Sequence, residues 1–225
     1  RMREISLDTE TTGFDPSTGD RIVEIGCVEM ESFVPTGRVF HRYINPERDM
    51  PEGAFKVHGL SEQFLRQHKV IAEEIDEFLE FIGDSKLVIH NAEFDMKFIN
   101  AELIRLKRPP LSMSQSIDTV AMARKMFPGA QANLDALCRR FKIDNSSRTK
   151  HGALLDAELL AEVYLELKGG RQRGLSLASE EEEQKSGFVA KSVARPPRLH
   201  FASEDELARH AAFLEKIKEP IWNRD

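Results

Sequence analysis

The sequence predicts an α/β domain built around one mixed β-sheet, followed by a tail that carries a single helix. Two observations predict this fold. Strand-like segments open the chain and then alternate with helical segments, which is typical of a sheet covered by helices. The composition then changes near residue 169, where Gly169-Gly170 ends a long helical pattern and Ser, Gly and Glu replace the apolar periodicity.

The elements expected along the domain follow from apolar periodicity and from the residues that end each run. Three strands come first, over 5–7, 22–28 and 40–44, and the second is apolar enough to be central in the sheet. Asn45-Pro46 ends the third strand, and Gly83 ends the first long helix. After the three strands we expect a helix over 71–82, a buried strand over 86–90, and helices over 94–106, 122–127, 133–141 and 154–167.

The tail is expected to hold a linker over 169–198 and one amphipathic helix within 199–225. Ser203 and Glu206 have the spacing of a capping box, which marks the start of this helix. Its apolar stripe consists of Leu207, Ala211, Leu214 and Ile217. A single helix cannot bury such a stripe by itself, so it either folds back on the domain or docks on a partner. The linker in front of it favours a partner.

Composition excludes several classes of protein. The chain has 225 residues, a formal net charge of −6, 40% hydrophobic and 31% charged residues, and two isolated cysteines, Cys27 and Cys138. This is typical of a globular cytoplasmic protein, and not of a membrane, collagen-like, zinc-finger or disulfide-stapled chain. Residues 1–168 carry the whole net charge, with 22 Lys and Arg against 28 Asp and Glu. Such an acidic domain is not expected to bind duplex DNA through the phosphate backbone of the DNA, because that mode of binding needs clustered Lys and Arg side chains.

Three acidic groups suggest chemistry. Asp8 and Glu10 are two residues apart at the end of a strand, so both carboxylates face one side of the sheet. Asp95 follows the strand end at His90-Asn91, and Asp156 lies among apolar neighbours five residues after His151. Each has an ordinary alternative: a solvated strand end for the first pair, the helix dipole for Asp95, and a solvated loop histidine for His151.

Taken together, these four carboxylates form a set of hard oxygen donors, which suits Mg²⁺ or Mn²⁺. Two divalent ions can stabilise both the attacking and the leaving oxygen of a phosphodiester displacement. A neutral histidine beside them can take the proton of the attacking water. The set is therefore compatible with phosphodiester hydrolysis by two metal ions.

The residues Asp8-Thr9-Glu10-Thr11-Thr12-Gly13, His90-Asn91 through Asp95, and His151 through Asp156 resemble, in order and spacing, the three motifs of the DEDDh family of 3′–5′ exonucleases. The resemblance implies a ribonuclease H-like, five-stranded mixed sheet within residues 1–168. It implies that Asp8 bridges both metals, that Glu10 and Asp156 complete one metal site, and that Asp95 holds the second. His151 would be the general base, and the 3′-terminal nucleotide would contact Asp8, Thr9, Glu10, His58 and Asp156.

One position departs from the family. A glutamate often stands five residues before the histidine of the Val57-His58-Gly59-Leu60 segment, whereas this chain has Gly53 there and Glu52 one residue earlier. A contact between an acid at that place and the terminal nucleotide is therefore not expected from the motif alone.

Further segments narrow the resemblance to the proofreading subunits of bacterial replicative DNA polymerases. These segments are Val57–Leu60, Ala123–Gly129, Leu134–Cys138 and His151–Ala157, and the likeness runs over 4–168. It implies removal of mismatched 3′ termini, and binding of the polymerase (alpha) subunit through the tail, with Leu207, Leu214, Ile217 and Trp222. The segment Gln172-Arg173-Gly174-Leu175-Ser176-Leu177 resembles a peptide that binds the sliding clamp (beta), with Gln172, Leu175 and Leu177 as contacts.

Two other functions remain open from the sequence. The first is an RNA-trimming or stand-alone DNA exonuclease of the same fold, which would not need a Glu-rich linker and a docking helix. The second is a catalytically silent scaffold between clamp and polymerase, against which the presence of all four acids and His151 argues.

Overall fold

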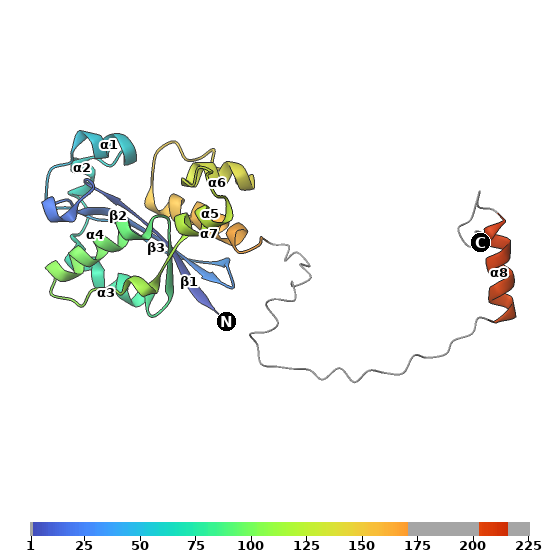
Figure 1. The fold of residues 1–225 in the computed structure, drawn as a ribbon. Coiled ribbons are helices and arrows are strands. Elements are labelled where there is room, and N and C mark those ends of the chain that lie inside the picture. The colour runs from blue at the N-terminus through green and yellow to red at the C-terminus, as the bar shows by residue number, and fades with distance from the viewer. Residues whose placement is uncertain (1, 171–202, 216–225) are drawn as a thin grey trace. The chain divides into compact units, whose positions relative to one another are not determined.

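The structure is a computed structural model that describes residues 2–170 and 203–215. The chain divides into two units, residues 1–175 and 176–225. The first unit holds the sheet and seven α-helices of the described residues, and the second holds one helix (Figure 1).

The first unit is built on a five-stranded mixed sheet in the order β3-β2-β1-β4-β5. Its strands are β1 (Arg3–Thr11), β2 (Ile22–Glu31), β3 (Val34–Tyr43), β4 (Lys86–Ile89) and β5 (Ser116–Asp118). β1 pairs antiparallel with β2 and parallel with β4, while β3 pairs antiparallel with β2 and β5 parallel with β4. The expected mixed five-stranded sheet flanked by helices is therefore confirmed.

Helices cover both faces of this sheet (Figure 1). α3 (Ile71–Ile82) and α4 (Ala92–Arg105) pack on one face, and α5 (Thr119–Met126), α6 (Leu134–Phe141) and α7 (Ala153–Leu167) pack on the other. The short helices α1 (Glu52–His58) and α2 (Glu62–Leu65) lie between β3 and α3 along the chain, and 3₁₀ turns occupy Pro16–Thr18 and Met113–Gln115. Each face thus has its own apolar core. The inner strands β1, β2 and β4 are buried between the two cores, whereas the edge strands β3 and β5 are more exposed.

The expected elements are present, with three omissions. β5 escaped prediction because its three residues, Ser-Ile-Asp, show no alternation that a pattern can detect. α1 and α2 escaped it because they are short and leave Phe55, Val57 and Phe64 exposed, so no buried stripe repeats at helical spacing. The predicted helix at 122–127 begins three residues earlier, where the Asp118 side chain accepts a hydrogen bond from Val120 N.

A glycine on β2 determines how closely α7 approaches the sheet. A Cβ atom at Gly26 would lie 2.3 Å from the carbonyl carbon of Ala153 and from the amide nitrogen of Leu154. Gly26 is also the β2 residue opposite Asp8 on β1. The first turn of α7 therefore rests directly on the backbone of the sheet beside Asp8, which any side chain at position 26 would prevent.

The second unit contains α8 (Glu204–Leu214), which starts directly after Ser203 as expected from the capping pattern. Of the predicted stripe, Leu207 is 57% exposed and Leu214 is half-buried. Ile217, Trp222, Gln172, Leu175 and Leu177 lie outside the described residues. Among the described helices, none is long and apolar enough to cross a membrane.

Candidate active site

The acidic residues meet at one edge of the sheet. β1, β4 and β5 run parallel, so their carboxyl ends lie at the same edge, where ligands bind in open α/β sheets. Asp8 and Glu10 end β1, His90 and Asn91 follow β4, and Asp118 ends β5. The end of β1 is therefore brought next to segments that follow it by about 80 residues or more in the sequence.

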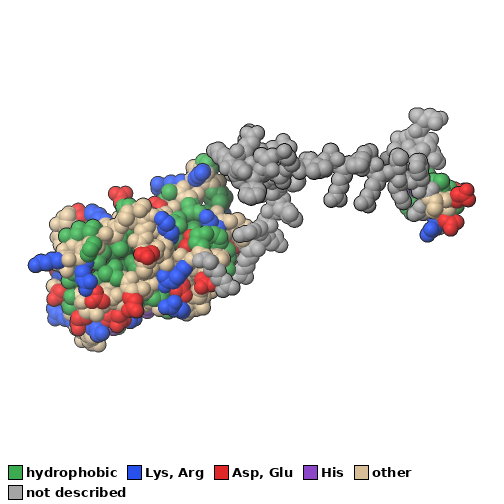
Figure 2. Space-filling view, turned by 90° about the horizontal axis from the view of Figure 1, so that it is seen from below, with side chains coloured by type: hydrophobic (Ala, Val, Ile, Leu, Met, Phe, Trp, Pro, Cys, Tyr) green, Lys and Arg blue, Asp and Glu red, His purple; other side chains and the backbone are tan. Residues whose placement is uncertain are grey.

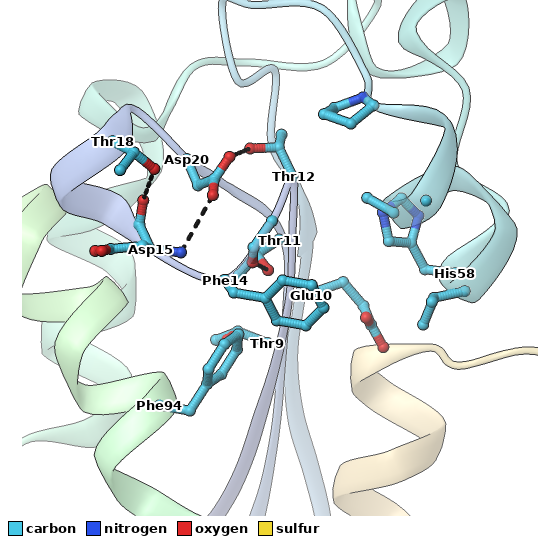
Figure 3. A pocket seen from close by; sticks show the side chains of 15 residues that line it. Thr9, Glu10, Thr11, Thr12, Phe14, Asp15, Thr18, Asp20, His58 and Phe94 are labelled. Atoms are coloured by element: carbon cyan, nitrogen blue, oxygen red, sulfur yellow. Dashed lines mark hydrogen bonds between the residues drawn. The ribbon is translucent and has the colours of Figure 1, made fainter.

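Asp8 and Glu10 share the face of β1 that α7 covers. On the same face, the Ser6 hydroxyl donates to the carbonyl of Ala157 at 2.7 Å, and the Tyr164 hydroxyl donates to Glu4 at 2.9 Å. The two-residue period of the strand then places Asp8 and Glu10 next along this row, toward the N-terminal end of α7. Figure 3 shows the Glu10 side chain extending from β1 toward His58, the last residue of α1, and toward the start of α7.

Asp95 reaches the site from the opposite face of the sheet. It lies in the first turn of α4 and is only 3% exposed. Its Oδ1 atom accepts hydrogen bonds from the backbone N and the Oγ1 of Thr9, at 3.0 and 2.7 Å. The helix dipole alone does not account for this buried, doubly bonded carboxylate. The backbone N–H and the hydroxyl of Thr9 are thus both engaged by Asp95.

Asp156, in the first turn of α7, is held by an arginine that the sequence analysis did not single out. Arg148 donates from Nε and Nη2 to the two carboxylate oxygens of Asp156, at 2.6 and 2.7 Å. Its Nη1 lies 2.8 Å from Asp135 Oδ1. The guanidinium therefore spans two carboxylates and is itself 7% exposed. The only signal for it in the sequence is a basic residue three positions before His151.

His151 lies beside the same arginine. Arg148 Nη2 and His151 Nδ1 are 2.6 Å apart, and His151 Nδ1 lies 3.3 Å from Asp156 Oδ2. The loop is tied to α1, because His151 N donates to the carbonyl of Val57 at 3.3 Å and the Lys150 ammonium lies 5.3 Å from the Phe55 ring centroid. The imidazole remains about half exposed, so its ring can turn without breaking these loop contacts.

The electrostatics of the cluster favour a bound cation. Burial raises the pKa of Asp8 well above its usual value, and the neighbouring Asp95 and Glu10 raise it further. Burial followed by the charge of Asp156 raises the pKa of Glu10 to about 8, and burial raises that of Asp95 to about 7. Burial would also raise the pKa of Asp156, but its hydrogen bonds from Arg148 outweigh this and lower it.

The donor atoms present fit a divalent metal ion. One ligand atom each of Glu10, His151 and Asp156 lies within 4.8 Å of the others. Asp8 and Asp95 lie outside this group of three, but burial raises the pKa of both carboxyls, and the charges of Asp95, Glu10 and Asp156 raise that of Asp8 further. A cation bound nearby would favour their ionised forms. A set dominated by carboxylate oxygens suits Mg²⁺ or Mn²⁺ more than a structural zinc ion.

A pocket of about 630 Å³ opens beside Glu10, with Phe14, Phe94 and His58 among its lining residues (Figure 3). The Nδ1 atom of His58 accepts a hydrogen bond from Leu60 N at 3.0 Å, which places the proton of the neutral ring on Nε2. Burial lowers the pKa of His58, which favours this neutral form. Its buried Nε2 has no hydrogen-bond partner among the described residues, so it can donate to a ligand in the pocket.

The position of Glu52 agrees with the departure seen in the sequence. Gly53 lines the pocket, whereas Glu52 is largely exposed and pairs with Lys56 at 2.5 Å on the surface of α1. No acid of α1 lines the pocket.

The fold and the carboxylate cluster define a nuclease-type site, and comparison with known proteins agrees. The profile of the exonuclease family matches residues 5–164. The solved structure of Exonuclease X in complex with 5′ overhanging duplex DNA is 24% identical, with a TM-score of 0.57 over 74% of this chain and 90% of that one. E. coli Exonuclease I in complex with a dT13 oligonucleotide is 18% identical, with a TM-score of 0.64 over 75% of this chain and 41% of that one. These two likenesses concern the fold.

Relatives with higher sequence identity show which group of exonucleases the chain belongs to. The chain is 53% identical to DNA polymerase III subunit epsilon of Rickettsia felis, over 96% of this chain and 97% of that protein. It is 42% identical to the protein of the same name from Escherichia coli, over 96% of this chain and 93% of that protein. The chain therefore belongs to the exonuclease family and, within it, to the family of DNA polymerase III epsilon subunits.

Proposed function

We propose that this protein hydrolyses the 3′-terminal phosphodiester bond of DNA and serves as the proofreading subunit of a bacterial replicative DNA polymerase, in the cytoplasm. The observation that carries this proposal is the convergence of Asp8, Glu10, Asp95 and Asp156 beside a pocket large enough for one nucleotide. A frayed, mismatched end would enter more readily than a paired one, because less unpairing is needed.

The metal sites would be divided among the four acids. Glu10 and Asp156 would hold one ion, Asp95 would hold the second, and Asp8 would bridge them. When bound, two Mg²⁺ or Mn²⁺ ions supply a nucleophilic water and stabilise the charge on the attacking and leaving oxygens. The Thr9 hydroxyl keeps the Asp95 carboxylate oriented through the 2.7 Å hydrogen bond.

His151 would act as the general base. In the described arrangement, Arg148 occupies its Nδ1 atom. When the ring turns out of this contact, the Nδ1 lone pair can accept a proton from the attacking water while Nε2 keeps its own. Arg148 remains anchored on Asp135, so it need not follow the ring. General-base catalysis of this kind typically contributes about 10²–10⁴ in rate.

The terminal nucleotide would lie in the pocket of Figure 3, in contact with Asp8, Thr9, Glu10, His58 and Asp156. The Nε2–H of His58 would donate to a sugar or phosphate oxygen, because this buried atom makes no hydrogen bond of ordinary geometry within the described residues. Phe14 is 85% exposed at the pocket and offers its ring for contact with the base.

The rest of the chain would hold the enzyme in the replication complex. We assign residues 1–168 to the exonuclease domain, 169–198 to a linker and 199–225 to the polymerase-binding segment. Leu207, Leu214, Ile217 and Trp222 would contact the DNA polymerase III alpha subunit, and Gln172, Leu175 and Leu177 would contact the sliding clamp (beta). The 57% exposure of Leu207 on α8 supports a role in docking. Tethering raises the effective concentration of the enzyme at the 3′ end without tight DNA binding of its own.

Digestion of a labelled primer tests the catalytic part of this proposal. A 5′-labelled single strand and a mismatched primer–template would be incubated with Mg²⁺, Mn²⁺ or EDTA. We expect metal-dependent shortening from the 3′ end, faster at the mismatch, and loss of at least tenfold in rate for His151→Gln. Glu158→Gln, on the exposed side of α7, is the matched control. Absence of digestion under either metal would refute the enzyme assignment.

A further inference from the structure

The arginines of the first unit fall into two groups. Within residues 2–170, nine arginines lie within 4 Å of a carboxylate. The three that have no described carboxylate at this distance are Arg124 on α5 and Arg139 and Arg140 on α6, and all three are exposed. On the face drawn in Figure 2, Lys and Arg side chains lie among Asp and Glu.

These three arginines line a path that leads to the catalytic acids. A pocket of about 250 Å³ contains Asp8 and Asp156, and it shares His90 and Asn133 with a neighbouring pocket that Arg124 lines. This second pocket shares Ala130 and Gln131 with a third, of about 640 Å³, which Arg139 and Arg140 line. We call Arg124, Arg139 and Arg140 the arginine track.

The helix dipole does not fully explain this arrangement. Basic residues in the last turns of α5 and α6 are favoured by the dipole, which accounts for their type. The dipole requires neither a hollow beside them nor a connection to the acids. In addition, Arg140 is fixed over the Phe127 ring at 4.3 Å, which brings the end of α6 against the end of α5 and gathers the charges in one place.

We propose that the arginine track binds phosphates of the substrate strand on the 5′ side of the bond that is cut. The terminal nucleotide pocket is lined by Glu10 and the 250 Å³ pocket by Asp8 and Asp156, so both pockets border the catalytic acids. A single strand whose 3′ end occupies the first pocket then continues through the second toward the track. Guanidinium groups suit phosphate oxygens, and three of them add affinity in an otherwise acidic domain. The inference rests on the proposed function, because it assumes that the 3′ end is bound beside Glu10.

Charge-removal variants of the full chain test the proposal. The test variant is Arg124→Ala/Arg139→Ala/Arg140→Ala. The control is Arg105→Ala/Lys107→Ala/Arg108→Ala, which removes the same charge at the far end of α4, about 20 Å of helix from the site. Each would be assayed with a 12-nucleotide single strand and with the p-nitrophenyl ester of thymidine 5′-phosphate, which is too short to reach the track.

For the test variant we expect KM on the 12-mer to rise about tenfold at low salt, with the slope of log affinity against log salt reduced by about 2. Hydrolysis of the ester should be unchanged, and Arg→Lys at all three positions should restore most of the affinity. Equal effects of the test and control variants, or none for the test variant, would overturn the proposal.

Fluorescence anisotropy of the 12-mer in EDTA separates this inference from the proposed function. If wild type cuts neither substrate, the proposed function fails, while weaker binding by the test variant than by the control still supports the track. Equal binding by the two variants overturns it.

Discussion

Glu10→Gln should stabilise the metal-free protein at alkaline pH, although it removes a proposed metal ligand. Burial and the charge of Asp156 raise the pKa of Glu10 from 4.5 to about 8 in the folded protein. Between these values the folded state binds more protons than the unfolded state, so the free energy of unfolding falls as pH rises. The amide carries no charge and removes this contribution.

The size of the effect follows from the same values. A rise in the pKa of Glu10 from 4.5 to about 8 lowers the free energy of unfolding by at most about 5 kcal/mol at pH 8 or above. Asp8, Asp95 and Asp156 share the electrostatic repulsion with Glu10, and removing one charge lets the other carboxyls ionise more readily. We therefore expect Glu10→Gln to raise the free energy of unfolding by about 2 kcal/mol. For a domain of this length that is an increase in Tm of about 4–8 °C.

Differential scanning calorimetry in EDTA at pH 5 and pH 8.5 measures this. The Tm of Glu10→Gln should exceed that of wild type clearly at pH 8.5 and only slightly at pH 5, just above the unfolded pKa of 4.5, whereas Glu158→Gln should match wild type at both. Adding Mn²⁺ should raise the Tm of wild type more than that of Glu10→Gln, because only wild type keeps the full set of ligands. A Glu10→Gln protein that is less stable than wild type in EDTA at pH 8.5 would refute the electrostatic reasoning.

Three further predictions concern other parts of the chain. Asp8→Ala should abolish cleavage and leave co-purification with the DNA polymerase III alpha subunit intact, while deletion of 199–225 should do the reverse. Gly26→Ala should force the start of α7 away from the sheet, because its Cβ would lie 2.3 Å from that backbone; we expect weaker Mn²⁺ binding by calorimetry and at least tenfold slower cleavage. Arg21→Ala should lower the free energy of unfolding by about 3–5 kcal/mol in urea, since it leaves Glu102 buried without its 2.7 Å partner.

The local pattern of apolar residues was sufficient to predict much of the fold. The helix over 71–82 was predicted to the residue, because four apolar side chains repeat at helical spacing and Gly83 follows. β2 was recognised as a central strand because both its faces are buried. β5 and α1 were missed because their side chains form no repeating buried face that a sequence pattern could detect. Neighbouring elements hold them in place.

The sequence was sufficient to identify the acids and the histidine of the candidate site, since their types and spacing are local properties. It also determined that Glu52 is one residue out of place, and the structure has that side chain on the surface of α1.

How these groups meet depends on the folded structure. Asp95 comes from the opposite face of the sheet, Gly26 lets α7 bring Asp156 close, and Arg148 joins Asp156 to Asp135. The arginine track likewise depends on which arginines lack a carboxylate after folding. These contacts join residues far apart in the chain, and no local periodicity encodes a distance between them.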